Sequence, residues 1–587
     1  MDKKNKWQIV LGSALLVLFL SGQGFPLHGA IAEFPLQTAA VFALAAFAVT
    51  GRRYEMLRRC TGWIFSMPRL PFNALLFAVS CTAYVLVALL EFKGIPRIDD
   101  GMAALFQARI FARGKITLPL PEDAGFFEVF GVLGQQAGLG HWCGMYPPGW
   151  PLLLTPGVWL GVPWLVNPVL GGMLVVTISE LGRSFYDERT GRLAALMAIP
   201  SPLIAVLSGL HLSHIPTALA LGLCLLSLKK LWQTERWFWG GAAGVLWGFA
   251  FLCRPLDAAV MGAIFALAFF FPASRFWRCR GGIAAGMAAA LLAIAALFIF
   301  QEITTHDWRT PGHVIGMGER GDFGFGRIDR VRTHTPAIAI QYSFMRLDVL
   351  NENLTGWPWP ALALVMLPFI LRRARAEDWL FLLPLPALLL TFACYWYYES
   401  CVPGRYLTPA FPFLFVLASS GFFSLQETLS RRGVWTKLPS FMVVSGVLFL
   451  GISTPAHLKL YPLSFLDVED VLPRVIRDYG ITNAVVFMDS VDRDQRRPDQ
   501  FNNYYATGFM RNDLDLTGDV LYVQNSRDQN IRMVKRHPDR TFWMYRFNRA
   551  LEKAYLYRVV IADEKLQMIP VKPATRDLLE APEVEPH

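Results

Sequence analysis

Asp99 and Asp100 form an acidic pair between an apolar stretch and a helical pattern of apolar residues. One interpretation is structural, because an aspartate at a helix start accepts hydrogen bonds from free backbone N–H groups. The other is catalytic, since a carboxylate in a cleft can act as a general base. Adjacent residues do not share a helix face, so one aspartate can cap while the other reacts. Both interpretations stay open.

Two arginines stand at the ends of apolar segments. Arg254 in FLCRPLDAAV precedes a proline, and Arg405 in CVPGRYLTP is followed by Tyr406. Each has an acidic neighbour, because Asp257 can pair with Arg254 and Glu399 can pair with Arg405. A phosphate is the alternative partner, since the planar guanidinium binds it with parallel hydrogen bonds. At headgroup depth that phosphate can belong to a lipid.

Further candidates for substrate contacts are His141, Tyr146, His313 and Glu399. His141 can donate to an anion, with an ordinary packed histidine as the alternative, and Tyr146 is typical of an interfacial anchor. His313 belongs to a Gly- and Pro-containing stretch with other His and acidic residues, but no H-x-x-x-H pair is present. We therefore expect no metal or other cofactor, with a divalent metal as the lesser alternative.

The composition indicates a membrane protein. Only 17% of the 587 residues are charged, 54% are hydrophobic and the mean hydropathy is +0.37, whereas soluble proteins carry about a quarter charged residues. Lys and Arg number 55 against 45 Asp and Glu. In a membrane protein this excess indicates basic cytoplasmic loops, so we expect membrane lipids and no nucleic acid as partners. The eight cysteines include no CxxC pair, which argues against a disulfide framework and a zinc ribbon.

Hydropathy predicts a mainly α, polytopic membrane helix bundle of about 13 spans. The predicted spans are 8–22, 34–50, 71–91, 164–182, 192–209, 213–230, 238–252, 256–272, 281–300, 357–371, 378–396, 406–424 and 438–455. No small-residue cleavage site follows the first, so we expect an anchor there. Seven basic segments share one side if the N-terminus is cytoplasmic and if 149–162, which contains prolines, forms a broken interfacial helix.

The predicted topology gives a transmembrane core over 1–456, with outer loops at 92–148 and 301–356, and an extracytoplasmic domain over 457–587. Within that domain VLPRVIRDYGI has helical spacing, and NAVVFMDS, GDVLYVQN and RTFWMYRF have the character of short buried strands. We therefore expect a small α/β domain.

The order and sidedness of these features resemble the GT-C superfamily of membrane glycosyltransferases. The acidic pair in the first outer loop, the following Pro-Pro segment, Arg254 and GRYLTPAFP carry the resemblance, which covers about residues 70–425. The nearest branch is that of bacterial aminoarabinose transferases and protein O-mannosyltransferases. The resemblance implies that a sugar moves, with inversion, from an undecaprenyl-phosphate-type donor to an acceptor hydroxyl. It also implies a multi-pass protein of the bacterial cytoplasmic (inner) membrane that acts at the outer face.

The resemblance assigns roles residue by residue. The base of the family maps to Asp99 or Asp100, with Asp99 slightly favoured, and Arg254, Arg405 and Tyr406 would hold the departing phosphate. Relatives often have a basic residue or histidine directly before Pro-Pro, where this chain has Tyr146. Many relatives of this type need no metal.

Two other functions remain open, a lipid or glycan transporter and a non-catalytic envelope scaffold. Transporters often bury ionisable residues at mid-membrane and contain inverted repeats, whereas this sequence keeps its charges at predicted helix ends and shows no internal repeat. A glycan, a lipid or a protein hydroxyl is compatible as the acceptor.

Overall fold

The computed structural model describes residues 35–582, except for 271–272, 322, 329–331, 400, 434–436, 465–467, 491–503 and 563–564. The chain divides into two compact units whose segments alternate along the sequence. The helical unit takes its described residues from Met1–Glu91, Trp164–Leu297 and Asp322–Ser464. The mixed unit takes them from Phe92–Pro163, Phe298–Gly321 and Phe465–His587.

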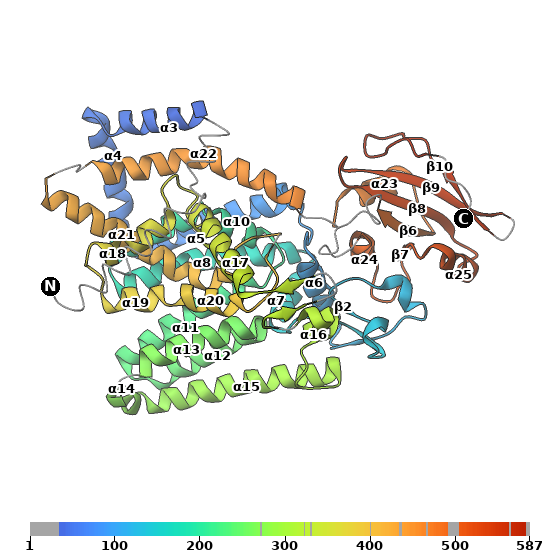
Figure 1. The fold of residues 1–587 in the computed structure, drawn as a ribbon, viewed down its shortest axis with the longest axis horizontal. Helices are drawn as coiled ribbons and strands as arrows, with labels where there is room; N and C mark the ends of the chain where they lie inside the picture. Colours follow the sequence, from blue (N-terminus) through green and yellow to red (C-terminus); the bar gives the residue numbers. More distant parts are fainter. Residues whose placement is uncertain are drawn as a thin grey trace. The chain divides into compact units, whose positions relative to one another are not determined.

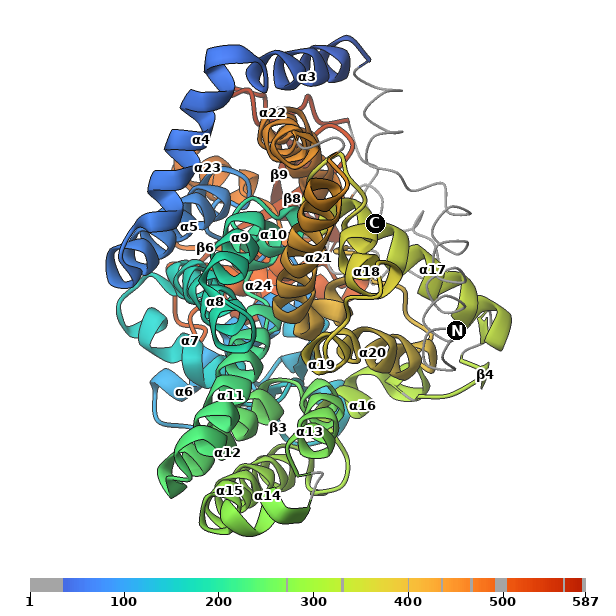
Figure 2. The same ribbon diagram turned by 90° about the vertical axis from the view of Figure 1, so that its left-hand side faces the viewer.

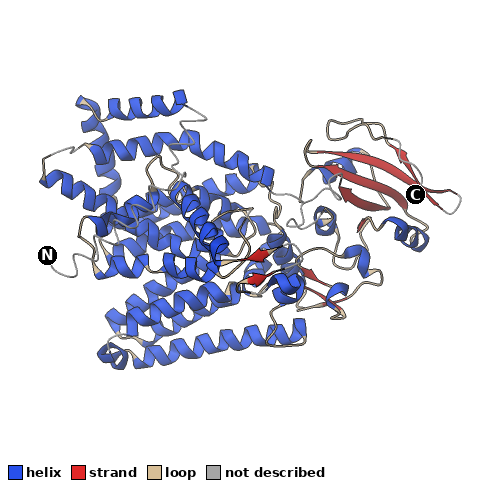
Figure 3. Ribbon diagram, viewed as in Figure 1, coloured by secondary structure: helices blue, strands red, loops and turns tan. Residues whose placement is uncertain are grey.

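The helical unit is built almost entirely of α-helices (Figure 3). They are α3 (Pro35–Ala48), α4 (Gly51–Ser66), α5 (Arg69–Leu90), α8 (Pro163–Phe185), α9 (Glu188–Ala198), α10 (Pro202–Gly209), α11 (His214–Thr234), α12 (Trp237–Cys253), α13 (Pro255–Phe270), α14 (Ala273–Arg278), α15 (Arg280–Thr305), α17 (Pro336–Asn353), α18 (Ala361–Ile370), α19 (Ala376–Leu382), α20 (Pro384–Ala393), α21 (Phe411–Arg431) and α22 (Leu438–Ser464). A 3-10 turn, η4 (Arg405–Ala410), leads into α21, and β4 (Gly326–Arg327) pairs with β5 (Thr333–His334).

Six helical segments in the described residues are long and apolar enough to cross a membrane. The bent pair α9–α10, with a 62° angle, qualifies as a seventh if it is one span. Each remaining predicted span from 34–50 onwards coincides with a shorter apolar helix. The membrane character is therefore confirmed, while the full number of spans stays a prediction. The first predicted span, 8–22, lies outside the described residues.

Several helices begin where a polar side chain caps free N–H groups. The side chain of Asp187 accepts from Thr190 N at the start of α9, and Thr335 accepts from Ile338 N at the start of α17. Pro336 follows Thr335 at the first helical position, where the missing N–H costs nothing. These caps are local sequence signals, and they set where each helix starts.

Small residues bring α12 and α15 close together, and these helices lie side by side with α13 in two views (Figures 1 and 2). A Cβ at Gly240 or Gly244 would overlap the backbone of Gly282 or Gly286. Within each helix the two glycines have the G-x-x-x-G spacing, which places them on one helix face. Such a stripe allows helix backbones to touch in a membrane, where lipid and side chains are equally apolar.

Two segments expected to be loops are helical. The basic segment GRRYEMLRRC lies within α4, because its Arg, Glu, Met and Leu residues all have high helix propensity. The predicted outer loop 301–356 contains α17 and the short α16 (Gly312–Met317). At 149–162 the structure has a single short helix, α7 (Gly149–Trp159), which contains Pro156 and with 11 residues is too short to span a membrane; its interfacial position stays a prediction.

The mixed unit contains a five-stranded sheet with the order β10-β9-β8-β6-β7. The strands are β6 (Ala484–Ser490), β7 (Val520–Gln524), β8 (Thr541–Asn548), β9 (Lys553–Ala562) and β10 (Lys565–Pro570), with helices α23 (Val471–Asp478), α24 (Ala506–Arg511) and α25 (Asn530–Arg536). β6 pairs in parallel with β7 and β8, and β8–β9 and β9–β10 are antiparallel. The predicted helix and three strands are confirmed, and β9 and β10 are additional.

The segment from Phe92 to Pro163 supplies the other part of the mixed unit. It contains α6 (Asp99–Ala112), β1 (Leu118–Pro119), η1 (Ala124–Phe127), β2 (Val132–Leu133), η2 (Gln135–Ala137), β3 (His141–Gly144) and α7, and η3 (Gly318–Gly321) follows α16 later in the chain. β3 lies between β1 and β2 in a small antiparallel sheet.

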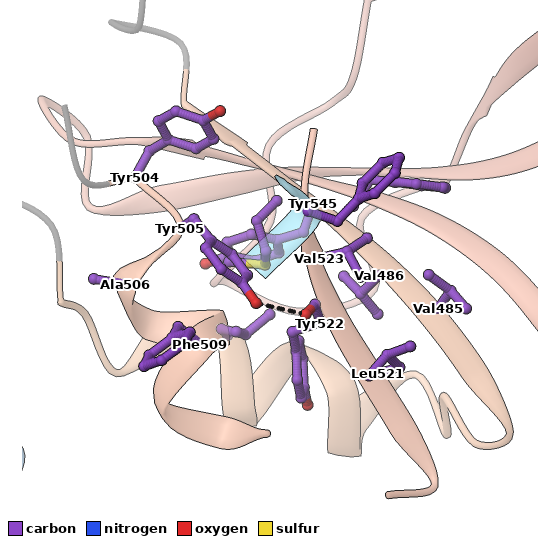
Figure 4. Packing of buried hydrophobic residues seen from close by; sticks show 14 of the residues in the cluster. Val485, Val486, Tyr504, Tyr505, Ala506, Phe509, Leu521, Tyr522, Val523 and Tyr545 are labelled. Carbon is purple, nitrogen blue, oxygen red and sulfur yellow. Dashed lines mark hydrogen bonds between the residues drawn. The ribbon is translucent and has the colours of Figure 1, made fainter. Parts of the chain in front are cut away.

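The central strand β6 is buried over Ala484–Met488, as expected for a parallel strand covered on both faces. In Figure 4 its valines pack with Tyr505, Phe509 and Tyr545, and the Tyr505 hydroxyl donates to Tyr522 O at 2.8 Å. The same hydrophobic core includes Met102, Phe106 and Ile110 of α6. The first predicted outer loop and the C-terminal sheet therefore share one core.

Candidate active site

The acidic pair begins α6. Ile98 is the N-cap and makes no side-chain cap bond, so Asp99 and Asp100 occupy the first helical turn. Negative charges are favourable there because free N–H groups give the helix start a partial positive charge. The Tyr146 hydroxyl donates to Oδ1 of Asp100 at 2.5 Å. The structure thus joins two of the predicted site residues through a short, charge-assisted hydrogen bond.

The loop that carries Tyr146 is docked on α6 by backbone contacts. Gly144 N donates to the Gln107 side chain at 2.8 Å, and Met145 N donates to Gly131 O at 3.0 Å. Gly131 has φ +92°, and a Cβ there would lie 2.9 Å from the Cβ of Ala103. Only a glycine allows this approach without strain, and the approach sets the height of Tyr146 beside the acidic pair.

The sheet domain holds the opposite end and flank of α6. The rings of Phe106 and Phe509 lie 5.1 Å apart, and Arg109 Nη2 donates to Asn512 O at 2.6 Å. Before the helix, Arg97 Nη1 donates to Val468 O at 3.0 Å. Bonds from arginines to carbonyls and a shared apolar core restrain α6, and with it the carboxylates at its start.

In the helical unit, Arg254 and Arg405 converge on one ring. Arg254 ends α12 and Pro255 starts α13, while Arg405 starts η4 after Gly404, which has φ +79°. The guanidinium carbon of each arginine lies 5.5 Å from the centroid of the Tyr406 ring. The aromatic face attracts both cations, so it holds two like charges in one place.

His214, the first residue of α11, completes this arrangement. Its ring is stacked on Tyr406 with centroids 6.3 Å apart and planes at 10°. The residue is buried, and neither ring nitrogen has a hydrogen-bond partner within the described part of the chain. Buried polar atoms are normally hydrogen-bonded, so an imidazole of this kind suits a bound acceptor or donor group. We name Arg254, Arg405, Tyr406 and His214 the cation cluster.

Both acidic neighbours take part in ion pairs. Arg254 forms the ion pair with Asp257 that the sequence suggested. Glu399 pairs with Arg346 of α17 at 3.0 Å, both side chains are fully buried, and Arg405 also interacts with Glu399 electrostatically. Arg346 also donates to Phe392 O and Tyr397 O at 3.2 and 3.1 Å. Burial raises the pKa of the Glu399 carboxyl, and the nearby Arg346 and Arg405 oppose that shift.

His141 and His313 lie in the mixed unit, and neither takes part in the hydrogen bond between Tyr146 and Asp100. His141 Nε2 lies 3.0 Å from Thr304 O, and its ring meets His306 edge-on at 5.2 Å. These contacts tie β3 to the end of α15, which agrees with the packed-histidine interpretation. His313 is half-buried in α16. Among the described residues, no group of three or more His, Cys, Asp or Glu side chains could hold a metal ion.

Arg346 and His214 were missed by the sequence analysis. Arg346 stands in a stretch with ordinary amphipathic character, QYSFMRLDVL, and its burial follows only from tertiary packing. His214 follows a second histidine in HLSHIP at the start of an apolar run. His214 could have been found from the sequence, because an ionisable residue at the end of a predicted span is a candidate for a functional site.

Comparisons with known proteins give one family match and several similar structures. Residues 163–300 match the family of dolichyl-phosphate-mannose-protein mannosyltransferases. ArnT from Cupriavidus metallidurans bound to undecaprenyl phosphate is a similar structure, with 12% identity and a TM-score of 0.48 over 81% of this chain and 93% of ArnT. An oligosaccharyltransferase of Archaeoglobus fulgidus, in complex with Zn and sulfate, has 12% identity and a TM-score of 0.40, over 65% of this chain and 53% of its own.

No curated protein matches the sequence significantly. The family match spans α8 to α15 and includes His214 and Arg254, whereas the acidic pair and Arg405 lie outside it. The predicted resemblance to membrane mannosyltransferases is therefore confirmed over residues 163–300.

Proposed function

We propose that this chain is a glycosyltransferase that moves a sugar from a polyprenyl-phosphate donor to an acceptor hydroxyl. The observation that carries the proposal is the cation cluster, in which two arginines converge on Tyr406 within the helical unit. Charged residues within a membrane protein are costly and therefore mark functional sites by default. The family match over residues 163–300 gives independent support.

The charge balance of this region favours an anionic ligand. Arg254, Arg405 and Arg346 carry three positive charges, against two negative charges on Asp257 and Glu399. A phosphate would offset the surplus, and its oxygens would accept hydrogen bonds from guanidinium and imidazole groups. The cluster would thus stabilise the lipid phosphate as it leaves, which is where negative charge develops during transfer.

The acidic pair supplies the base in this proposal. Asp99 or Asp100 takes the proton of the acceptor hydroxyl, the acceptor oxygen bonds to the anomeric carbon, and the bond from that carbon to the phosphate oxygen breaks with inversion. Base catalysis contributes about 10²–10⁴-fold, so most of the rate would come from positioning and leaving-group stabilisation. Tyr146 would position Asp100 through the bond between them. His141, His313 and Glu399 are further candidates for contacts with the substrate in this proposal.

The same proposal includes the predicted topology and chemistry. The protein would span the bacterial cytoplasmic membrane about 13 times, with a cytoplasmic N-terminus and residues 457–587 outside. An undecaprenyl-phosphate-type lipid would carry the sugar, and a glycan, lipid or protein would receive it. Because two arginines are available for the phosphate, we expect transfer to persist when divalent metals are chelated with EDTA.

Binding of undecaprenyl phosphate, the proposed lipid product, tests this site. Native mass spectrometry of the purified full-length chain should show one bound lipid, and Arg254→Gln and Arg405→Gln should each weaken binding at least tenfold. Arg309→Gln is the matched control, because Arg309 lies in the exposed segment after α15, stacked on Trp308. Equal binding by all variants would remove the basis of the proposal.

A further inference from the structure

A second basic site lies in the helical unit, in a cavity of about 440 Å³. Three helix ends surround it, namely the junction of α8 and α9, the junction of α18 and α19, and the C-terminal half of α21. The lining is mostly polar and consists of Tyr186, Asp187, Thr190, Arg373, Arg375, Ser420, Phe423, Ser424, Glu427 and Arg431.

The three arginines of the cavity exceed the carboxylates available to them. Glu427 is shared, since Arg373 Nη1 and Arg431 Nη2 each lie 2.5 Å from one of its oxygens. Asp187 is committed to α9, where it accepts from Thr190 N at 2.8 Å. Arg375 interacts electrostatically with Asp378 beside the cavity, and the lining itself carries three arginines against the two carboxylates of Asp187 and Glu427.

Arg375 is held in place without being neutralised. Its guanidinium carbon lies 5.8 Å from the centroid of the Tyr186 ring, and its backbone N donates to Asp378 Oδ2 at 2.6 Å. The Tyr186 hydroxyl donates to the other oxygen of Asp378, also at 2.6 Å. A stacked arginine whose donors are not used by a carboxylate is suited to a planar, two-point contact with phosphate.

The cavity is remote from the cation cluster. Arg405 lies just before α21, while Glu427 and Arg431 lie in its last turns. The helix has 21 residues, which at 1.5 Å per residue gives a length of about 30 Å, close to the thickness of the hydrocarbon layer. The two sites thus belong to opposite membrane faces, and the predicted topology makes the cavity cytoplasmic.

We propose that this cavity binds a phosphate group at the cytoplasmic face, carried either by an acidic phospholipid headgroup or by a small soluble phosphate. Basic pockets between helices on this side of a membrane are suited to acidic headgroups. Ser424 would add a hydroxyl donor, and Phe423 would border the apolar part of a lipid. The inference is separate from sugar transfer and holds whether or not the chain is an enzyme.

The test is a titration of the purified full-length chain in neutral detergent. Short-chain phosphatidylglycerol and inorganic phosphate are compared, with short-chain phosphatidylcholine as the zwitterionic reference. All measurements use the Arg254→Gln/Arg405→Gln background, so that the proposed donor site does not contribute. We expect Arg375→Gln to weaken binding at least tenfold and Arg431→Gln to weaken it severalfold. Arg372→Gln is the matched control, because it removes an equal charge from the same loop but does not line the cavity.

The ligand arms separate the two sources. Binding of phosphatidylglycerol but not of inorganic phosphate supports a headgroup site, and binding of both with the same dependence on Arg375 supports a general phosphate site. The proposal is overturned if neither binds, or if Arg372→Gln weakens binding as much as Arg375→Gln. Thermal unfolding of each variant identifies misfolding, and Arg431, being largely exposed, provides the variant least prone to it.

Discussion

The buried pair of Arg346 and Glu399 leads to a prediction that links the fold to the cation cluster. Arg346 is fully buried, and its guanidinium satisfies Glu399 and two backbone carbonyls. In Arg346→Met the Glu399 carboxyl loses the buried partner that opposes the rise of its pKa. Breaking a buried pair on one side destabilises a protein by about 3–5 kcal/mol, because an uncompensated charge remains.

The orphaned carboxylate has one nearby alternative. Arg405 already interacts electrostatically with Glu399, so the carboxylate would turn towards it. Neutralising Arg405 in this way would weaken phosphate binding at the cation cluster. A change of about 1.4 kcal/mol in binding free energy changes the affinity tenfold. A loss of about 3 kcal/mol in binding free energy would therefore weaken the affinity for phosphate roughly 100-fold, which is the largest effect we expect.

The assay is a double-mutant cycle on undecaprenyl phosphate affinity and thermal stability. Arg346→Met should lose one to two orders of magnitude in affinity, and Arg346→Met/Glu399→Gln should recover at least tenfold, because the surplus negative charge is gone. Asp348→Asn on the same helix is the control and should leave the affinity unchanged. A double variant that binds no better than Arg346→Met would refute the reasoning, since the defect would then not arise from Glu399.

Three further predictions concern other parts of the chain. Tyr146→Phe should lower the rate of transfer about tenfold or more with little change in donor affinity, because a hydrogen bond to a charged group contributes about 1.5–3 kcal/mol; an unchanged rate would exclude a positioning role. Gly244→Ala should lower the melting temperature and the yield in detergent, because its Cβ would overlap the backbone of Gly286. Gly241→Ala should not, because a Cβ there meets only ordinary contact with Ala285 at 3.8 Å. Burial raises the pKa of the Cys143 thiol to about 12, so maleimide should label it at pH 8 only after unfolding, and its thiolate should form only as the pH approaches that value; rapid labelling of the native protein would contradict its burial.

The membrane helices could be predicted from the sequence because the hydropathy of a segment depends only on its own residues. Every described predicted span coincides with an apolar helix or bent helix pair, and the strands of NAVVFMDS and its neighbours were visible as apolar runs. α4 was missed because its basic residues were interpreted only as a sign of sidedness, although their helix propensity is high. β9 was missed although KAYLYRVVIA is rich in aromatic and β-branched residues, which are typical of a strand.

The site was predictable only in part, since partner choice depends on tertiary packing. Arg254 pairs with Asp257 three residues away, which spacing suggested, whereas Glu399 is joined to Arg346, 53 positions away. The hydrogen bond from Tyr146 to Asp100 also joins distant positions. Such pairings arise from how helices and loops pack, and no single segment of the sequence encodes them.

The most direct test of the central claim is a comparison of envelope glycans by mass spectrometry. Wild-type cells, a deletion strain, and the deletion strain carrying Asp99→Asn, Asp100→Asn or the control Glu122→Gln at matched expression would be compared. We predict that the deletion removes one sugar from a glycolipid, polysaccharide or glycoprotein, that Glu122→Gln restores it, and that at least one aspartate variant does not. Full restoration by both aspartate variants would contradict base catalysis by this pair and would favour a carrier or a scaffold.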